Sequence, residues 1–312
     1  MSSQREKYLE IFNGINFEQI KDHPNILIAA NFWSNERFEA AKNCYKFMRV
    51  IDDLIDNHKA SHAMIADNEK NHFVEDVDHW INMLIEKSNN NPLQKELIDS
   101  IEKFQIPLWP MEAFAKSMIY DIHHDGFQTL HDFMEYAKGA SVAPASIFVH
   151  LCGIQKQNGK YTSPNFDVKK VSTPCAVFSY LVHIIRDFQK DQLNNLTYFA
   201  DDLVLKNNLT RKDLKEMAHG GAIKQGFRNL IREYCGIADD YRNKTYRAIT
   251  DIWPCLEPEY QLSLEIIFNL YLMVFERIDI DHGNFTEAEL NPTPDEIKRR
   301  VYQTILESKT IR

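Results

Sequence analysis

The chain has 312 residues, of which 44% are hydrophobic and 26% are charged. This balance is ordinary for a globular protein and provides material for a sizeable core. The net charge of −9 argues against a general nucleic-acid binder, which normally carries a basic face. Glycines are few, and no GxGxxG or GxxxxGK[ST] pattern occurs. A glycine-rich nucleotide loop is therefore disfavoured, and no nicotinamide-binding fingerprint is found.

Cysteine usage and hydropathy predict a protein of the cytoplasm. The five cysteines are widely spaced, with no CxxC pair, which indicates reduced thiols rather than a disulfide framework or a zinc site. The N-terminus lacks the apolar core of a signal peptide, and no window of 18 uncharged apolar residues could form a transmembrane helix. We therefore expect a soluble protein, with peripheral membrane contact left open for collecting an apolar substrate. The sequence carries no signal for an oligomeric state.

Apolar residues recur in steps of three and four along most of the chain, which is typical of amphipathic helices. Helices are predicted over the ranges 36–57, 111–122, 129–152, 174–190, 211–235, 238–252 and 259–279. Thr173 is expected to cap a helix that begins at Pro174. Thr210 and Asp213 resemble a capping box at the start of the helix that follows them.

Strands should be few or absent, because no sustained alternation of apolar and polar residues is bounded by turns. No break between the predicted helices resembles a long interdomain linker. A single domain over 1–312 is therefore predicted, with a core at about 20–280 and a C-terminal helix at about 294–308 that Thr293-Pro294 opens. The expected architecture is an all-α bundle of roughly ten helices around a central cavity.

A charged stripe lies on the helix predicted at 36–57. It consists of Arg49, Asp52, Asp53 and Asp56, at offsets 0, +3, +4 and +7. The stripe is contiguous with the apolar side through Tyr45 and Met48, whereas a solvated stripe should lie opposite that side. A charged helix end on the surface is the alternative. Three acids near a helix C-terminus oppose the helix dipole, which favours a ligand-binding role instead.

A second charged stripe follows a buried helix. Residues 175–185 are nearly all apolar, as expected of a helix that is enclosed on every side. The same helix then presents His183, Arg186, Asp187 and Asp191 at offsets 0, +3, +4 and +8. Buried charges are costly unless they are paired or bound to metal. Simple pairing of Arg186 with Asp187 is the alternative, and it loses weight because a matching stripe exists.

Together the two stripes predict a magnesium site. Carboxylates at i and i+4 lie roughly 5–6 Å apart at Cβ, and two such faces would form an oxygen-rich cage for hard divalent cations. The candidate ligands of Mg²⁺, with Mn²⁺ as an alternative ion, are Asp52, Asp53, Asp56, Asp187 and Asp191. Because Mg²⁺ usually keeps waters and binds carboxylates together with substrate phosphates, the expected ligand is a phosphorylated molecule.

Three segments, in this order, resemble motifs of the squalene/phytoene synthase family. YKFMRVIDDLID at 45–56 is similar to the family's first aspartate-rich motif, and HIIRDFQKD at 183–191 is similar to its second, N-I-x-R-D-x-x-x-D. YAKGASV at 136–142 is similar to the Y-x-x-A-G-x-V segment between them. Asp121 lies where the family carries an aspartate upstream of that segment. The resemblance covers roughly residues 20–280.

The resemblance implies the all-α isoprenoid synthase fold and head-to-head coupling of two prenyl diphosphates through a cyclopropylcarbinyl diphosphate, with farnesyl diphosphate as the favoured substrate. It implies that Mg²⁺ ions bound to diphosphate are held by Asp52, Asp56, Asp187 and Asp191. Tyr45, Arg49 and Arg186 would contact the diphosphate. His183 would lie beside them, and Tyr136 would lie near the reacting carbons. Bridging Mg²⁺ and arginine neutralise a diphosphate leaving group, and aromatic faces stabilise an allylic cation.

The chain also departs from the family pattern. His183 replaces an asparagine, and Lys190 stands where an acidic residue is common. The segment NLTYFA at 195–200 lacks the arginine and the proline of the family's G-R-x-[YF]-[LFW]-P pattern, with Leu196 among the replacements. These departures leave the product, the chain length of the substrate and the need for NADPH open.

Several alternatives remain. One is a relative that converts presqualene diphosphate and water to hydroxysqualene. Class I terpene cyclases and head-to-tail prenyl synthases also use DDxxD, but residues 183–191 match the second motif of neither. A different class is a catalytically reduced lipid-binding homologue that keeps the fold. Retention of four aspartates and two arginines argues against it, because an inactive cavity has no need to bury them.

Overall fold

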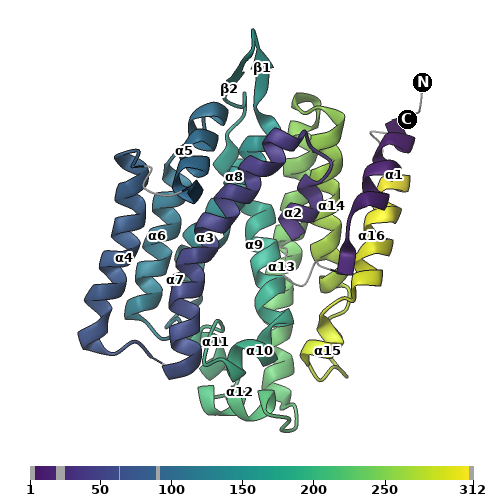
Figure 1. Cartoon of the computed structure of the whole chain (residues 1–312). Coiled ribbons are helices and arrows are strands. Elements are labelled where there is room, and N and C mark those ends of the chain that lie inside the picture. Colours follow the sequence, from purple (N-terminus) through teal and green to yellow (C-terminus); the bar gives the residue numbers. More distant parts are fainter. Residues whose placement is uncertain (1–3, 19–24, 63, 89–91, 309–312) are drawn as a thin grey trace.

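The computed structural model describes residues 4–18, 25–62, 64–88 and 92–308. Regular structure in these residues is almost entirely helical, which confirms the predicted all-α class (Figure 1). The first half of the chain contains α1 (Gln4–Gly14), α2 (Asn25–Ala30), α3 (Asn35–His62), α4 (Asp67–Ile85), α5 (Pro92–Phe104), α6 (Trp109–His123), α7 (Leu130–Ala137), the π-helical segment η2 (Lys138–Val142) and α8 (Ala143–Gly153). The described residues form more helices than the roughly ten expected.

The second half begins with a small antiparallel hairpin of β1 (Gln155–Gln157) and β2 (Lys160–Thr162), in which Lys156 pairs with Tyr161. It continues with α9 (Val168–Arg186), α10 (Phe188–Leu193), α11 (Asp201–Lys206), α12 (Arg211–Ala218), α13 (Gln225–Ile252), the 3-10 turn η3 (Trp253–Cys255), α14 (Pro258–Phe275), α15 (Glu287–Leu290) and α16 (Pro294–Glu307). The C-terminal helix therefore lies where it was expected, and it packs against α1.

The apolar helix α9 lies in the middle of the bundle (Figure 1). It packs against α13, α8, α14 and η2. Its fully buried side chains include Phe178, Leu181, Val182 and Ile185. A helix that is apolar on several sides is stable in water only when other elements cover it, so its composition places it at the centre. The charged residues at its end are consequently held inside the molecule.

The helix α3 divides its surface between the core and a cavity. The core face is spaced in steps of three and four: Ala40, Cys44, Phe47, Ile51 and Ile55. The adjacent face carries the charged stripe. The helix continues to His62, so the acidic cluster lies more than a turn before the helix end rather than at it.

Between α7 and α8 the chain forms a π-helical segment instead of the uninterrupted helix predicted at 129–152. A Cβ added at Gly139 would lie 2.1 Å from the carbonyl oxygen of Ala113 and 2.2 Å from Oγ of Ser117, so only glycine lets this segment approach α6 so closely. The Ser117 hydroxyl also donates to the Tyr136 carbonyl at 2.8 Å. A π-bulge at this point is typical of a functional site.

Several predicted helix boundaries are wrong. The helices predicted at 211–235 and 238–252 are not separate at that point, because α13 runs unbroken from Gln225 to Ile252, and the helix predicted at 174–190 is divided at Asp187. The helix expected to start at Pro174 starts at Val168, where Asp167 caps it by accepting from the Lys170 amide, and Pro174 lies inside it. The helix expected at 211–235 is broken between α12 and α13, where Gly220 adopts φ +92° and ends the first helix. The capping box of Thr210 and Asp213 is confirmed.

Candidate active site

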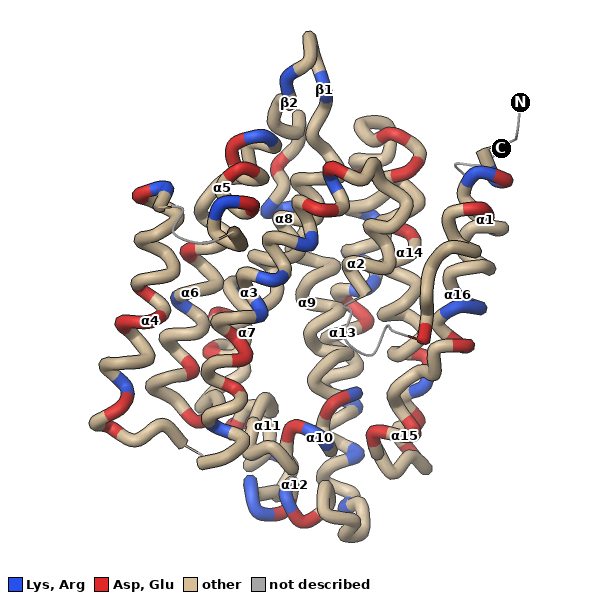
Figure 2. Tube along the Cα trace, in the orientation of Figure 1, with Lys and Arg blue, Asp and Glu red and all other residues tan. Residues whose placement is uncertain are grey.

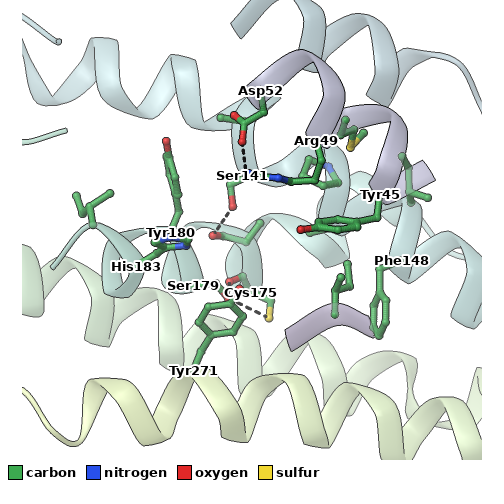
Figure 3. Close-up of a pocket in the computed structure, with 18 of the residues that line it drawn as sticks. Tyr45, Arg49, Asp52, Ser141, Phe148, Cys175, Ser179, Tyr180, His183 and Tyr271 are labelled. Atoms are coloured by element: carbon green, nitrogen blue, oxygen red, sulfur yellow. Dashed lines mark hydrogen bonds and ion pairs between the residues drawn. The ribbon is translucent and has the colours of Figure 1, made fainter. Parts of the chain in front are cut away.

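A cavity of about 490 Å³ lies between α3, η2 with α8, α9 and α14 (Figure 3). Its lining runs from apolar to charged along two helices: from Ala41 to Asp56 on α3, and from Val171 to Asp187 on α9. At about 1.5 Å per residue, each helix provides roughly 22–24 Å of wall. Both helices run downward in Figure 1, so their charged ends meet at the same end of the cavity. The result is an elongated space with an apolar body and an ionic head.

The first acidic cluster is partly neutralised by Arg49. This side chain lies 2.7 Å from a carboxylate oxygen of Asp52 and also pairs with Asp53. Burial and the neighbouring charge of Asp56 raise the pKa of Asp52 to about 7. Burial and the charge of Asp121 raise the pKa of Asp56 to about 6. The carboxylates of this cluster therefore repel one another, and the positive charge of Arg49 does not fully neutralise them.

The second acidic cluster behaves differently, because Asp187 is saturated with donors. Arg186 donates to it through Nε at 2.6 Å and Nη2 at 2.8 Å, and Nε2 of His183 lies 2.7 Å from its Oδ2. Burial acts to raise the pKa of Asp187, but His183 and Arg186 outweigh it and hold that pKa well below the usual range. In contrast, burial and the charges of Asp187 and Asp56 raise the pKa of Asp191. The repulsion between Asp56 and Asp191 shows that the two clusters face each other.

Tyrosine hydroxyls line the cavity next to these acids. Tyr136 donates to Asp121, and its ring lies 6.3 Å from that of Tyr180, which lies 6.2 Å from that of Tyr198. Burial and the charge of Asp121 raise the pKa of Tyr136 well above its ordinary value. The phenols therefore stay neutral, and their rings provide an aromatic wall beside the acids.

Nearly all of the predicted site residues line this one cavity: Tyr45, Arg49, Asp52, Asp53, Asp56, Tyr136, His183, Asp187 and Asp191. Arg186 is the exception, because it lies behind Asp187 and reaches the site through it. Lys190 and Leu196, two of the departures from the family pattern, also line the cavity.

Several site residues escaped the sequence analysis. Tyr180, Tyr198 and Tyr271 line the cavity, but nothing in their spacing distinguishes them from core aromatics. Lys59 is buried and lies 3.7 Å from Asp121. Its position, one turn after Asp56 on the same helical stripe, was a readable signal.

In the part of the chain that the structure describes, no three His, Cys, Asp or Glu side chains converge as a metal site of their own. Among the same residues, no helix has the length and apolarity to cross a membrane. Lys and Arg alternate with Asp and Glu along the described trace (Figure 2).

The fold and the cavity define a class of protein: an all-α bundle that encloses an apolar cavity with facing acidic clusters at one end. The model of the squalene/phytoene synthase family matches residues 22–300. The chain belongs to this family, which confirms the resemblance seen in the motifs.

Individual relatives are distant. A chloroplastic phytoene synthase of Narcissus pseudonarcissus is 19% identical over 256 residues, which is 81% of this chain and 56% of that protein. The chain thus spans about half the length of this curated relative.

Solved structures share the fold. A dehydrosqualene synthase in complex with ligand has a TM-score of 0.65 at 15% identity and covers 94% of this chain and 97% of its own. The squalene synthase HpnC from Alicyclobacillus acidocaldarius has a TM-score of 0.65 at 13% identity, with 87% and 94% covered. YisP from Bacillus subtilis subsp. subtilis strain 168 has a TM-score of 0.62 at 14% identity, with 96% and 98% covered.

Proposed function

We propose that this protein is a Mg²⁺-dependent prenyltransferase that couples two prenyl diphosphates head-to-head, with farnesyl diphosphate as the substrate, through a cyclopropylcarbinyl diphosphate. The observation that carries the proposal is the cavity itself, in which an apolar body joins an end lined by two acidic clusters. A prenyl chain fits the apolar body, and its diphosphate belongs at the ionic end. Family membership supports the same reaction.

The residues present fit bound Mg²⁺. The carboxyls of Asp52, Asp56 and Asp191 are half-buried in the cavity wall and repel one another, so a cation would relieve that repulsion. Because Mg²⁺ needs few protein ligands when a phosphate completes its shell, the absence of a preformed metal cluster among the described residues is compatible with this role. Asp53 and Asp187 are the further candidate ligands. When bound, Mg²⁺ would supply a Lewis acid for the departure of diphosphate.

The protein's own groups have distinct roles in this proposal. Arg49 and Lys190 line the cavity and would bind the diphosphate oxygens that metal leaves free. Arg186 and His183 would hold Asp187 in place through the three contacts that they make with it. The apolar walls would exclude water from the allylic cation, and the tyrosine rings would stabilise it.

Tyr136 would accept the proton that the carbon skeleton loses. One diphosphate leaves with the C–O electron pair, and the resulting allylic carbon bonds to the double bond of the second chain, which leaves a cation there. The electrons of one C–H bond of the same allylic carbon would then close the cyclopropane ring onto this cation, and the proton would pass to the phenol oxygen. The phenol's own proton passes to Asp121, to which Tyr136 already donates. This pairing lets a neutral tyrosine act as an acceptor although burial raises its pKa well above its ordinary value.

The test is incubation of the purified protein with farnesyl diphosphate and Mg²⁺, with and without NADPH, followed by extraction of the products. We expect pyrophosphate release and a coupled thirty-carbon product that EDTA abolishes. Squalene in the NADPH arm alone would show that a reductant is used. A parallel arm supplied with presqualene diphosphate tests the presqualene-converting alternative, which would give hydroxysqualene there and no product from farnesyl diphosphate. A cyclic fifteen-carbon product, or no product in either arm, would contradict the proposal and indicate a cyclase or a lipid-binding homologue.

A further inference from the structure

Lys59 is a buried cation behind the acidic wall of the cavity. Its residue is only 5% exposed, and its Nζ donates to the His124 carbonyl at 2.9 Å. The same Nζ lies 3.7 Å from Oδ1 of Asp121. Lys59 does not line the cavity, so it has no direct route to a ligand there. Asp121 is the group with which Lys59 forms an ion pair, although the charge of the ammonium also acts on Asp56, one turn earlier on α3.

Asp121 connects Lys59 to the cavity. Its Oδ2 accepts the hydroxyl proton of Tyr136, while its Oδ1 faces the lysine. Burial and the charge of Asp52 act against ionisation, and the Lys59 ammonium opposes them, so the pKa of Asp121 rises only to about 6. A line of polar contacts therefore runs from a fixed cation to a phenol that lines the cavity.

The arrangement controls where the phenol points its proton. A tyrosine hydroxyl has one proton and two lone pairs. Because Tyr136 donates that proton to Asp121, its lone pairs remain to accept, and the Tyr180 hydroxyl is a neighbour within hydrogen-bonding reach on the cavity side. A protonated or displaced Asp121 would leave the phenol free to turn its proton toward the substrate. A buried ion pair is a poor source of stability compared with apolar packing, so this pair is better explained by orientation than by folding.

We propose that Lys59 is a positioning residue, which holds Asp121 in place so that Tyr136 presents an accepting oxygen to the prenyl chain. This inference rests on the proposed coupling reaction. Lys59 contacts neither substrate nor metal in this scheme. Its removal should therefore impair turnover and leave binding intact.

The kinetic test compares Lys59→Met with Lys59→Arg, using Lys46→Met as a matched control, because Lys46 is an exposed lysine of the same helix. Lys59→Met should lower kcat roughly 10²-fold with KM within about twofold, since a misdirected general base loses most of its contribution. Lys59→Arg should recover most of the loss, and Lys46→Met should match the wild type.

Lys59→Met leaves the Asp121 carboxylate without its cation, which disfavours folding of that variant. The double variant Lys59→Met/Asp121→Asn removes both charges of the pair together, so it can be used if the single lysine variant folds poorly. If Lys59 acts only through Asp121, the double variant should turn over no more slowly than Asp121→Asn alone. A further loss beyond Asp121→Asn would overturn the proposal. A change confined to KM, or no rescue by arginine, would overturn it as well.

A readout independent of activity is the ¹³Cζ resonance of labelled tyrosine, with the Tyr136 signal assigned by Tyr136→Phe. Lys59→Met and Asp121→Asn should both shift this signal, and Lys59→Arg should leave it in place. An unmoved signal in Lys59→Met would overturn the positioning role. If the wild type couples no prenyl diphosphates, the proposed function fails, and this signal alone decides whether Lys59 orients the phenol.

Discussion

The carboxyl of Asp56 should destabilise the metal-free protein, and the effect should grow with pH. Its pKa rises from 3.8 to about 6 because it is buried among other acids. A folded-state pKa above the unfolded value means that the native state binds more protons in this window. Stability therefore falls as pH rises from about 4 to about 7. At about 1.4 kcal/mol per pKa unit, the full shift corresponds to up to ~3 kcal/mol above that window.

Asp56→Asn removes this charge and keeps the shape of the side chain. In EDTA, urea unfolding should show the variant to be more stable than the wild type by ~2–3 kcal/mol at pH 8 and by only ~1 kcal/mol at pH 4.5. The matched control is Asp53→Asn, because Asp53 belongs to the same cluster but its side chain is 47% exposed. That control should change stability by under ~0.5 kcal/mol at either pH. Equal or lower stability of Asp56→Asn at pH 8 would refute the charge-repulsion account of this site.

Three further substitutions test other parts of the structure. Gly139→Ala should destabilise the protein by ~2–4 kcal/mol in urea unfolding, because the added Cβ would meet the backbone of α6. The control Gly236→Ala, with open space around it in α13, should be neutral or stabilising, and equal effects of the two substitutions would contradict the close approach. Arg186→Lys should weaken the binding of Mg²⁺-pyrophosphate, measured by calorimetry, about tenfold, because lysine cannot make both contacts with Asp187. Unchanged binding would show that Arg186 is not needed to orient the Asp187 carboxylate. Arg37→Met should lower the free energy of unfolding in urea by ~2–4 kcal/mol, because the carbonyls of Leu151 and Ile154, at the end of α8, lose their donor. A loss under ~1 kcal/mol would contradict the role of Arg37 in holding this end of α8.

The sequence predicted the fold class and each of the two charged stripes because both depend on local periodicity. A helix that is apolar on all sides must be central, and its terminal charges must then be inside. Residues at i, i+3, i+4 and i+7 must share a face. These rules needed no tertiary information, but they do not say that the two faces meet, as they do where Asp56 and Asp191 line one cavity.

Tertiary contacts decided what the sequence could not. Pro174 looked like a helix start, yet the cap of Asp167 and the packing of α9 carry the helix through it. The spacing of His183 and Arg186 made them foreseeable partners of Asp187. It did not predict that the two side chains would contact both carboxylate oxygens. The structural role of Lys59 depends on its ion pair with Asp121, which belongs to another helix, α6. Contacts between distant segments leave no periodic trace in a sequence.

The most direct test of the central claim is calorimetric binding of pyrophosphate in the presence and absence of Mg²⁺. The wild type should bind only when Mg²⁺ is present, because its acidic clusters otherwise repel the anion. Asp56→Asn/Asp191→Asn, which removes one carboxylate from each cluster, should weaken this binding at least 10²-fold. Binding by the wild type without Mg²⁺, or unchanged Mg²⁺-dependent binding by the double variant, would contradict the claim that the two clusters jointly hold metal against diphosphate.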